Sequence, residues 1–152
     1  MYRRIVGRKV RKAWGHVDAR EVAPLLDGFA ATFEYRFVGD HALSGVRTTR
    51  PTMEAFFARL FRLLPDARFT VEDVIVRGWP WDTRAVALVR VDAPGDYRNE
   101  VAQTIDIRWG RIVAITTLED TKKLSDALDA LAAAGVGEAA APPITDAGPV
   151  PA

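Results

Sequence analysis

Four segments rich in β-branched residues follow one another between residues 68 and 119, with only short turns between them. The segments are RFTVEDVIVRG, TRAVALVRVD, YRNEVAQTIDIRW and RIVAITTLE, and the connections are WPWD, APGD and the single Gly110. Connections this short join antiparallel neighbours, because a parallel crossover needs about a dozen residues or more. The second half of the chain is therefore expected to fold as a meandering antiparallel sheet.

Helical spacing dominates the first half of the chain instead. Apolar side chains recur every three or four positions in residues 6–17, in residues 22–29 and in residues 53–64. Asp18, followed three residues later by Glu21, has the spacing of a capping box and is expected to open the second helix. Three helices are therefore predicted before the sheet.

A short strand is predicted between the second and third helices, in the stretch TFEYRFVG. Its aromatic side chains, Phe33, Tyr35 and Phe37, occupy alternate positions, whereas Glu34 and Arg36 lie between them. This period of two places the three rings on one face of a half-buried strand.

Helices that precede strands, with little alternation, are typical of the α+β class. A last helix is expected over Thr121 to Ala134, and residues 1–134 are expected to form one domain. Residues 135–152 are rich in Ala, Gly and Pro and are expected to form a flexible tail or a strap along the surface. A bent sheet covered by three helices on its concave side encloses the kind of apolar space in which small molecules bind.

Composition excludes several classes of function. The chain has no cysteine and two histidines, so it is expected to hold no disulfide and no cysteine- or multi-histidine-ligated metal. Its net charge of +1, without a recognised nucleic-acid motif, argues against a nucleic-acid partner, and the basic residues of the first helix are interpreted as a solvated face. No apolar run approaches the roughly 18 residues that span a membrane, and no signal peptide is recognised. A cytoplasmic protein without cofactor or metal is expected.

Two stretches, FVGDHALSGVRTTRPTMEAFFARLF and RWGRIVAITTLEDT, resemble the nuclear transport factor 2-like superfamily, as does the order of the elements. This superfamily includes SnoaL-like polyketide cyclases, ketosteroid isomerases and limonene epoxide hydrolases. The resemblance covers about residues 1–134. It implies a cone-shaped, curved, antiparallel or mixed sheet packed against three N-terminal helices, with a C-terminal helix, and a homodimer formed through the outer face of the sheet.

The catalytic residues of ketosteroid isomerases are missing from the positions that resemble theirs. Tyr35 stands where their general-base carboxylate would be, Lys12 falls near their helix tyrosine, and Ile105 falls near their protonated aspartate. Steroid isomerisation by that route is therefore not expected.

The Asp-Arg-Asp relay of limonene epoxide hydrolases is matched only in part. Arg90 and Asp92 resemble the paired Arg and Asp, but their face of the strand is expected to point outward. Thr117 stands where the second aspartate would be.

Alternation along the strands predicts which side chains face the cavity. In the second long strand the residues Ala85, Ala87, Val89 and Val91 share a wholly apolar face. In the third strand one face has Gln103, Ile105, Ile107 and Trp109, and in the fourth one face has Val113, Ile115, Thr117 and Glu119. By similarity to the family these faces are assigned to the cavity, although a β-bulge would invert the assignment. The predicted ligand-binding residues are Trp14, Phe33, Phe37, Phe56, Val89, Gln103, Ile105 and Thr117.

Three residues are predicted to be catalytic. Tyr35 can donate a hydrogen bond to a carbonyl or phenolate oxygen, although a core tyrosine with its hydroxyl satisfied locally would show the same pattern. His41, expected at the mouth of the cavity, can act as a general acid or base, or can be a turn residue beside Asp40. Glu119 is the carboxylate placed inward; it can move a proton, or lie in solvent where the strand ends.

The leading hypothesis is a pocket for a small hydrophobic molecule, in a cofactor-free isomerase, cyclase or epoxide hydrolase that works by general acid/base proton transfer. The alternative is a non-catalytic ligand-binding or dimeric assembly module of the same fold. Trp79 and Trp81 can close the cavity, or can cover the core or a dimer partner.

Overall fold

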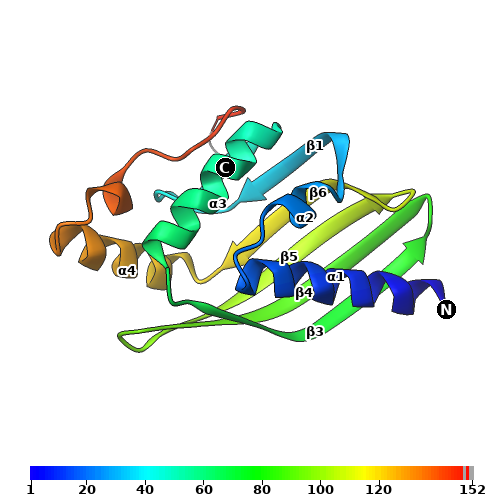
Figure 1. Cartoon of the computed structure of the whole chain (residues 1–152), viewed down its shortest axis with the longest axis horizontal. Helices are drawn as coiled ribbons and strands as arrows, with labels where there is room; N and C mark the ends of the chain where they lie inside the picture. Colours follow the sequence, from blue (N-terminus) through cyan, green and yellow to red (C-terminus); the bar gives the residue numbers. More distant parts are fainter. Residues whose placement is uncertain (149, 151–152) are drawn as a thin grey trace.

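The computed structural model describes residues 1–148 and 150 and has the predicted α+β architecture (Figure 1). Its helices are α1 (Tyr2–Asp18), α2 (Ala23–Leu26), α3 (Arg50–Leu63) and α4 (Thr121–Ala133), followed by a 3-10 turn, η1 (Gly137–Ala140). Its strands are β1 (Phe29–Phe37), β2 (Gly45–Arg47), β3 (Arg68–Trp79), β4 (Asp82–Ala93), β5 (Tyr97–Arg108) and β6 (Arg111–Glu119).

The six strands form one unclosed sheet in the order β2-β1-β6-β5-β4-β3. The four long strands make the predicted antiparallel meander, because each pairs with the next through a short turn. The short strand β1 pairs antiparallel with β2 but parallel with β6, so the sheet is mixed.

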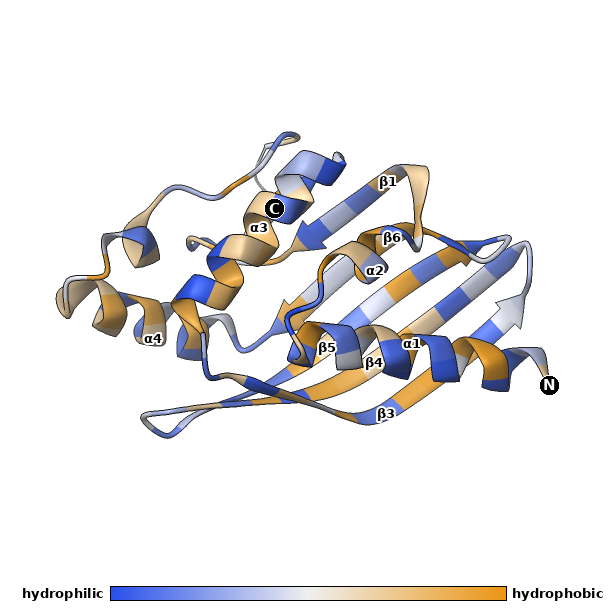
Figure 2. Cartoon of the chain, in the orientation of Figure 1, coloured by the Kyte–Doolittle hydropathy of each residue, from blue (hydrophilic) through white to orange (hydrophobic). Residues whose placement is uncertain are grey.

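Helices α1, α2 and α3 lie over one face of the curved sheet, and their apolar stripes face it (Figure 1). Hydrophobic and hydrophilic residues alternate along β4 and β5, as the period of two requires (Figure 2). The predicted stripe of α1 is confirmed, since Val6, Val10, Trp14 and Val17 are all buried. Each large apolar side chain buried in this way contributes about 1.5–3 kcal/mol to stability.

The predicted capping box at Asp18 is wrong. Helix α1 continues to Asp18, and α2 begins at Ala23 without a side-chain cap. The Asp18 carboxylate instead accepts a hydrogen bond from the backbone N–H of Phe69 at 2.9 Å and pairs with Arg68 at 2.7 Å. It therefore joins the end of α1 to the start of β3.

A β-bulge changes the predicted inner face of β6. Ile112 pairs with Ile107 and Ala114 pairs with Asp106, so Val113 has no partner on β5. The extra residue brings Ile112, rather than Val113, into the wall of the cavity, because a bulge inverts the alternation on one side of it. Beyond the bulge the predicted face is kept.

The C-terminal segment, residues 135–148, lies against α3 and β2 (Figure 1). Asp146 accepts hydrogen bonds from Thr48, Thr49 and Thr52 around the start of α3. Glu138 pairs with Arg62 at 2.6 Å. None of residues 135–148 lines the cavity described below.

No helix within residues 1–148 and 150 has both the length and the apolar character needed to cross a membrane.

Candidate functional site

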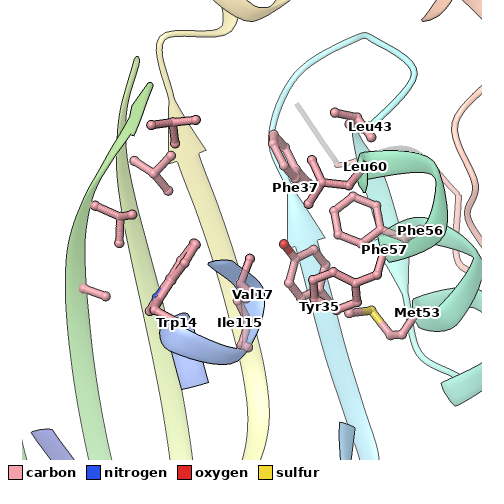
Figure 3. Close-up of a cluster of buried hydrophobic side chains, with 14 of the residues drawn as sticks. Trp14, Val17, Tyr35, Phe37, Leu43, Met53, Phe56, Phe57, Leu60 and Ile115 are labelled. Carbon is pink, nitrogen blue, oxygen red and sulfur yellow. The ribbon is translucent and has the colours of Figure 1, made fainter. Parts of the chain in front are cut away.

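A cavity of about 490 Å³ lies between the concave face of the sheet and the helices α1, α2 and α3. Its walls are mostly apolar and include Trp14 from α1, Phe37 from β1, Phe56 from α3 and Ile105 from β5. Figure 3 shows Tyr35 and Phe37 on one face of β1, packed beside Phe56 and Phe57 of α3, with the Tyr35 hydroxyl directed away from α3. A volume of this size suits a small organic molecule.

Three polar side chains form a connected chain on the cavity wall. The Gln103 Nε2 donates to Thr117 Oγ1 at 3.1 Å, and Thr117 Oγ1 donates to the Tyr35 hydroxyl oxygen at 3.2 Å. Because the Tyr35 oxygen accepts this bond, its own proton remains available to a ligand. Burial raises the pKa of Tyr35 above its usual 10.0, which keeps that proton in place at neutral pH.

A second polar cluster surrounds Glu119, which also lines the cavity. Asn99, which is 2 % exposed, donates to Glu119 Oε2 at 3.2 Å and to the Tyr97 hydroxyl at 3.0 Å. The other carboxylate oxygen, Oε1, is buried and has no hydrogen-bond partner among the described residues. Burial, with a smaller contribution from the neighbouring Asp120, raises the pKa of Glu119 to about 8.

Strand register brings the two clusters together. Gln103 on β5 pairs with Thr117 on β6, and Val101 pairs with Glu119, so all four point to the same side of the sheet. Thr117 and Glu119 are two residues apart on β6, a separation of about 7 Å. A tyrosine hydroxyl and a carboxyl group thus face one apolar cavity.

Most of the predicted ligand-binding residues line this cavity: Trp14, Phe37, Phe56, Gln103, Ile105 and Thr117. Phe33 and Val89 are buried but lie outside the lining. Phe33 packs against Phe29, with ring centroids 4.6 Å apart. Val89 lies under the helices, and Val91 takes its place in the cavity wall further along β4.

His41 lies away from its expected place at the mouth of the cavity. Its ring stands edge-on to that of Phe37, at a centroid distance of 5.3 Å, and it is not part of the lining. Its Nδ1 accepts a hydrogen bond from the backbone N–H of Leu43, and burial lowers the pKa of the imidazole. A Cβ at Gly39 would lie 2.5 Å from His41 Nε2, so the turn that holds this ring requires glycine there.

Tyr97, Asn99 and Arg47 were missed by the sequence analysis. Tyr97 and Asn99 continue the alternation Gln103–Val101 toward the turn before β5, so the period of two contained their signal. Arg47 is fully buried, with its guanidinium carbon 4.1 Å from the Phe56 ring centroid. It donates to the carbonyls of Leu43 and Ser44, and therefore secures the turn behind Tyr35.

The rim of the cavity is charged. Its lining includes Lys9, Lys12 and His16 of α1, and Asp27. The side chains of Lys9 and Lys12 are exposed. Of the described residues, no three His, Asp or Glu side chains are grouped so that they could hold a metal ion.

This chain is similar to known proteins in sequence and in fold. Residues 10–115 match the model of the SnoaL-like domain. Among curated protein sequences, none matches the chain at a significant level.

The similar solved structures share the fold at low sequence identity. PrhC from Penicillium brasilianum is 15% identical, with a TM-score of 0.67 over 84% of this chain and 87% of that one. A nuclear transport factor 2-like protein of unknown function from Burkholderia pseudomallei is 16% identical, with a TM-score of 0.64 over 78% and 93%. TerC, co-crystallised with polyporic acid, is 15% identical, with a TM-score of 0.63 over 77% and 92%.

Proposed function

The chain belongs to the SnoaL-like domain family, and from the geometry of its cavity we propose that it is an enzyme that moves a proton on a small hydrophobic ketone. The proposed reaction class is isomerisation or cyclisation through an enol or enolate, without a cofactor. One observation carries the proposal: Tyr35 and Glu119, whose Oε1 has no hydrogen-bond partner among the described residues, both line one apolar cavity.

The role proposed for Tyr35 is to bind the substrate oxygen. Its proton is free because its oxygen already accepts from Thr117, so it donates to the carbonyl oxygen of the bound ketone. Negative charge grows on that oxygen as the enolate forms, and a fixed donor in an apolar site stabilises it more than water would. Gln103, anchored by Thr117, offers a second polar contact beside it.

The role proposed for Glu119 is to take a proton from the carbon beside the carbonyl and to return it at the new position. A pKa of about 8 places the carboxyl group near the working pH, where it can accept and release a proton with similar ease. Asn99 binds Oε2, whereas Oε1 is buried and has no hydrogen-bond partner among the described residues, so a small rotation of the side chain would be needed to bring Oε1 to the substrate. His41, the other predicted proton carrier, lies outside the lining and is given no role in this step.

The experiment is exchange of deuterium into β-tetralone, a bicyclic ketone with acidic carbon-bound hydrogens, followed by NMR in D₂O. The native protein is expected to accelerate exchange, with a rate that rises with pH through about 8 as Glu119 ionises. Glu119→Gln should lower this rate by about 10² to 10⁴, and Tyr35→Phe by roughly 10².

Glu100→Gln is the matched control, because Glu100 is an exposed carboxylate of β5 that lies outside the lining. It should exchange at the native rate. A panel of such ketones that binds but gains no exchange would contradict the enzyme and favour a non-catalytic ligand-binding module. Exchange that survives in Glu119→Gln would remove the role given to Glu119.

We also propose that the outer face of the sheet pairs with a second copy of the chain. Ile75, Leu88 and Leu118 on this face are 55%, 38% and 43% exposed. Trp79, Trp81 and Trp109 lie at the adjoining hairpins, outside the cavity lining, and are more than half exposed. Sedimentation equilibrium should give a dimer, and Leu88→Lys should shift it toward monomer; a native monomer at micromolar concentration would contradict the pairing.

A further inference from the structure

The rim of the cavity carries positive charge that no neighbouring carboxylate neutralises. Lys9 and Lys12 line the cavity and are exposed, and neither takes part in an ion pair with the described residues. The acidic residue at the rim, Asp27, is already paired with Arg50 at 2.9 Å. His16 lies 3.3 Å from Glu21. The two lysines are therefore the charges left available to a ligand.

Positive charge is concentrated on α1, where Lys9 and Lys12 line the cavity and the four arginines lie outside its lining. Helix α1 has six basic residues, Arg3, Arg4, Arg8, Lys9, Arg11 and Lys12, and one acidic residue, Asp18. The whole chain has a net charge of only +1, so the remainder has more acidic than basic side chains. A cleft with one sign of charge at its edge attracts ligands of the opposite sign and raises their association rate.

The polar groups inside the cavity would contact a different part of the ligand from the part that the two lysines contact. The inner wall offers the neutral donors Tyr35 and Gln103, and its carboxyl group, Glu119, would repel an anion when ionised. Between this wall and the rim the lining is apolar, with Val10, Trp14 and Ile105. A ligand that satisfies all three zones has a neutral oxygen at one end, an apolar body and an anion at the other.

We propose that the substrate of this site is a hydrophobic keto acid whose carboxylate lies at the rim, against Lys9 and Lys12. The proposal rests on the function given above for Tyr35 and Glu119, and it adds the substrate class and the residues that select it. The carboxylate would be bound by two separate ammonium groups, which act as point charges, because the lining contains no arginine that could form a bidentate fork with it.

The experiment compares two probes that differ in charge alone, pyrenebutyric acid and pyrenebutanol, by fluorescence titration of the whole protein. The native protein is expected to bind the acid about fivefold more tightly than the alcohol, since each exposed ion pair contributes modestly. The double variant Lys9→Gln/Lys12→Gln should lose this preference while its affinity for the alcohol is unchanged. Raising the ionic strength should also reduce the preference in the native protein.

The control is Lys122→Gln/Lys123→Gln, which removes the same charge from α4, outside the cavity lining. This control variant should keep the native preference for the acid. A loss of preference seen only in Lys9→Gln/Lys12→Gln would then not be an effect of net charge. Binding of both probes with equal affinity would overturn the keto-acid proposal alone. A preference that survives in the rim variant would also overturn it. Failure of both probes to bind would overturn the cavity as a ligand site, and the proposed function with it.

Discussion

Polar side chains are arranged differently on the two faces of the same strands. On the outer face of β4 and β5, charged side chains neutralise one another: Arg84 pairs with Asp106 at 2.6 Å, and Arg90 with Asp92 at 2.8 Å. On the concave face, polar side chains are joined by hydrogen bonds that leave a Tyr35 proton and a Glu119 oxygen without a partner among the residues that the structure describes. The difference supports the proposal that the inner polar groups bind a ligand, because buried polar groups without partners cost stability.

This comparison also bears on the partial resemblance to limonene epoxide hydrolases. Arg90 and Asp92, which resemble part of the relay of limonene epoxide hydrolases, form an ion pair on the outer face and lie outside the cavity lining. Glu119, which matches none of the family positions considered, faces the cavity. Position in the fold therefore favours a general acid/base role for Glu119 over an Arg-Asp relay.

The largest effect is expected from the ionisation of Glu119. Its pKa is about 8 in the folded chain and 4.5 ordinarily, so the folded state binds the proton more tightly than the unfolded state. Its contribution to stability is therefore fully present below pH 4.5 and is lost as the pH rises to 8, at a cost of a few kcal/mol. Relative to the native protein, Glu119→Gln should gain stability between pH 5 and 9 in urea titrations.

Glu100→Gln, on the outer side of β5, tests whether this effect belongs to the cavity. It should keep the native dependence of unfolding free energy on pH. If Glu119→Gln and the native protein lose stability in parallel across this range, Glu119 is not buried as a carboxylic acid and the contrast between the faces fails.

An intermediate effect is expected when the same residue type is truncated on each face. Ile105 is 5% exposed on the concave side of β5, whereas Ile75 is 55% exposed on the outer side of β3. Ile105→Ala should cost about 3 kcal/mol in urea unfolding, because it removes buried apolar surface and leaves a void. Ile75→Ala should cost less than about 0.5 kcal/mol at protein concentrations that give monomer; equal costs would contradict the assignment of the faces.

Much of the contrast between the two faces of the sheet could be predicted from the sequence, because inward and outward side chains alternate along each strand. The expected inner face of β4 is confirmed: Ala85, Ala87, Val89 and Val91 are all buried. Alternation fails where a strand gains a residue. The bulge at Val113 moved Ile112 into the cavity wall, and nothing in RIVAITTLE indicates which residue is extra.

Other features could not be predicted because they depend on contacts between distant segments. Asp146 is nearly one hundred residues from Thr48 and Thr49, yet it satisfies both of their backbone N–H groups at the start of α3. Burial opposes ionisation of Asp146, but the hydrogen bonds from these threonines and Thr52 outweigh it and lower its pKa to about 2. Composition indicated only that this segment would be a tail or a strap.

The site itself was predicted in part. Alternation together with the resemblance to the family predicts that Tyr35, Gln103, Thr117 and Glu119 face the cavity, and these residues line it. His41 was expected at the rim because it follows a strand, but the turn after Phe37 folds its ring back behind that residue. The path of a turn depends on backbone conformations such as the positive φ of Gly39. Residue type permits such a conformation but does not determine it.

The smallest effect on stability is expected from Gln103→Leu. Among the described residues, the Gln103 side chain makes one hydrogen bond, to Thr117, which also donates to Tyr35. Replacing the amide by an apolar side chain of similar size removes that bond without creating a buried donor, so unfolding free energy should change by less than about 1 kcal/mol.

If Gln103 instead serves the fold, its loss should destabilise the chain and leave ligand binding intact. If it serves the ligand, Gln103→Leu should unfold at nearly the native urea concentration while β-tetralone binds several-fold more weakly, because the ketone oxygen loses a donor. Thr104→Val, its neighbour on the outer side of β5, is the matched change and should alter neither value. A large loss of stability with Gln103→Leu would mean that the inner polar groups stabilise the sheet rather than bind a ligand.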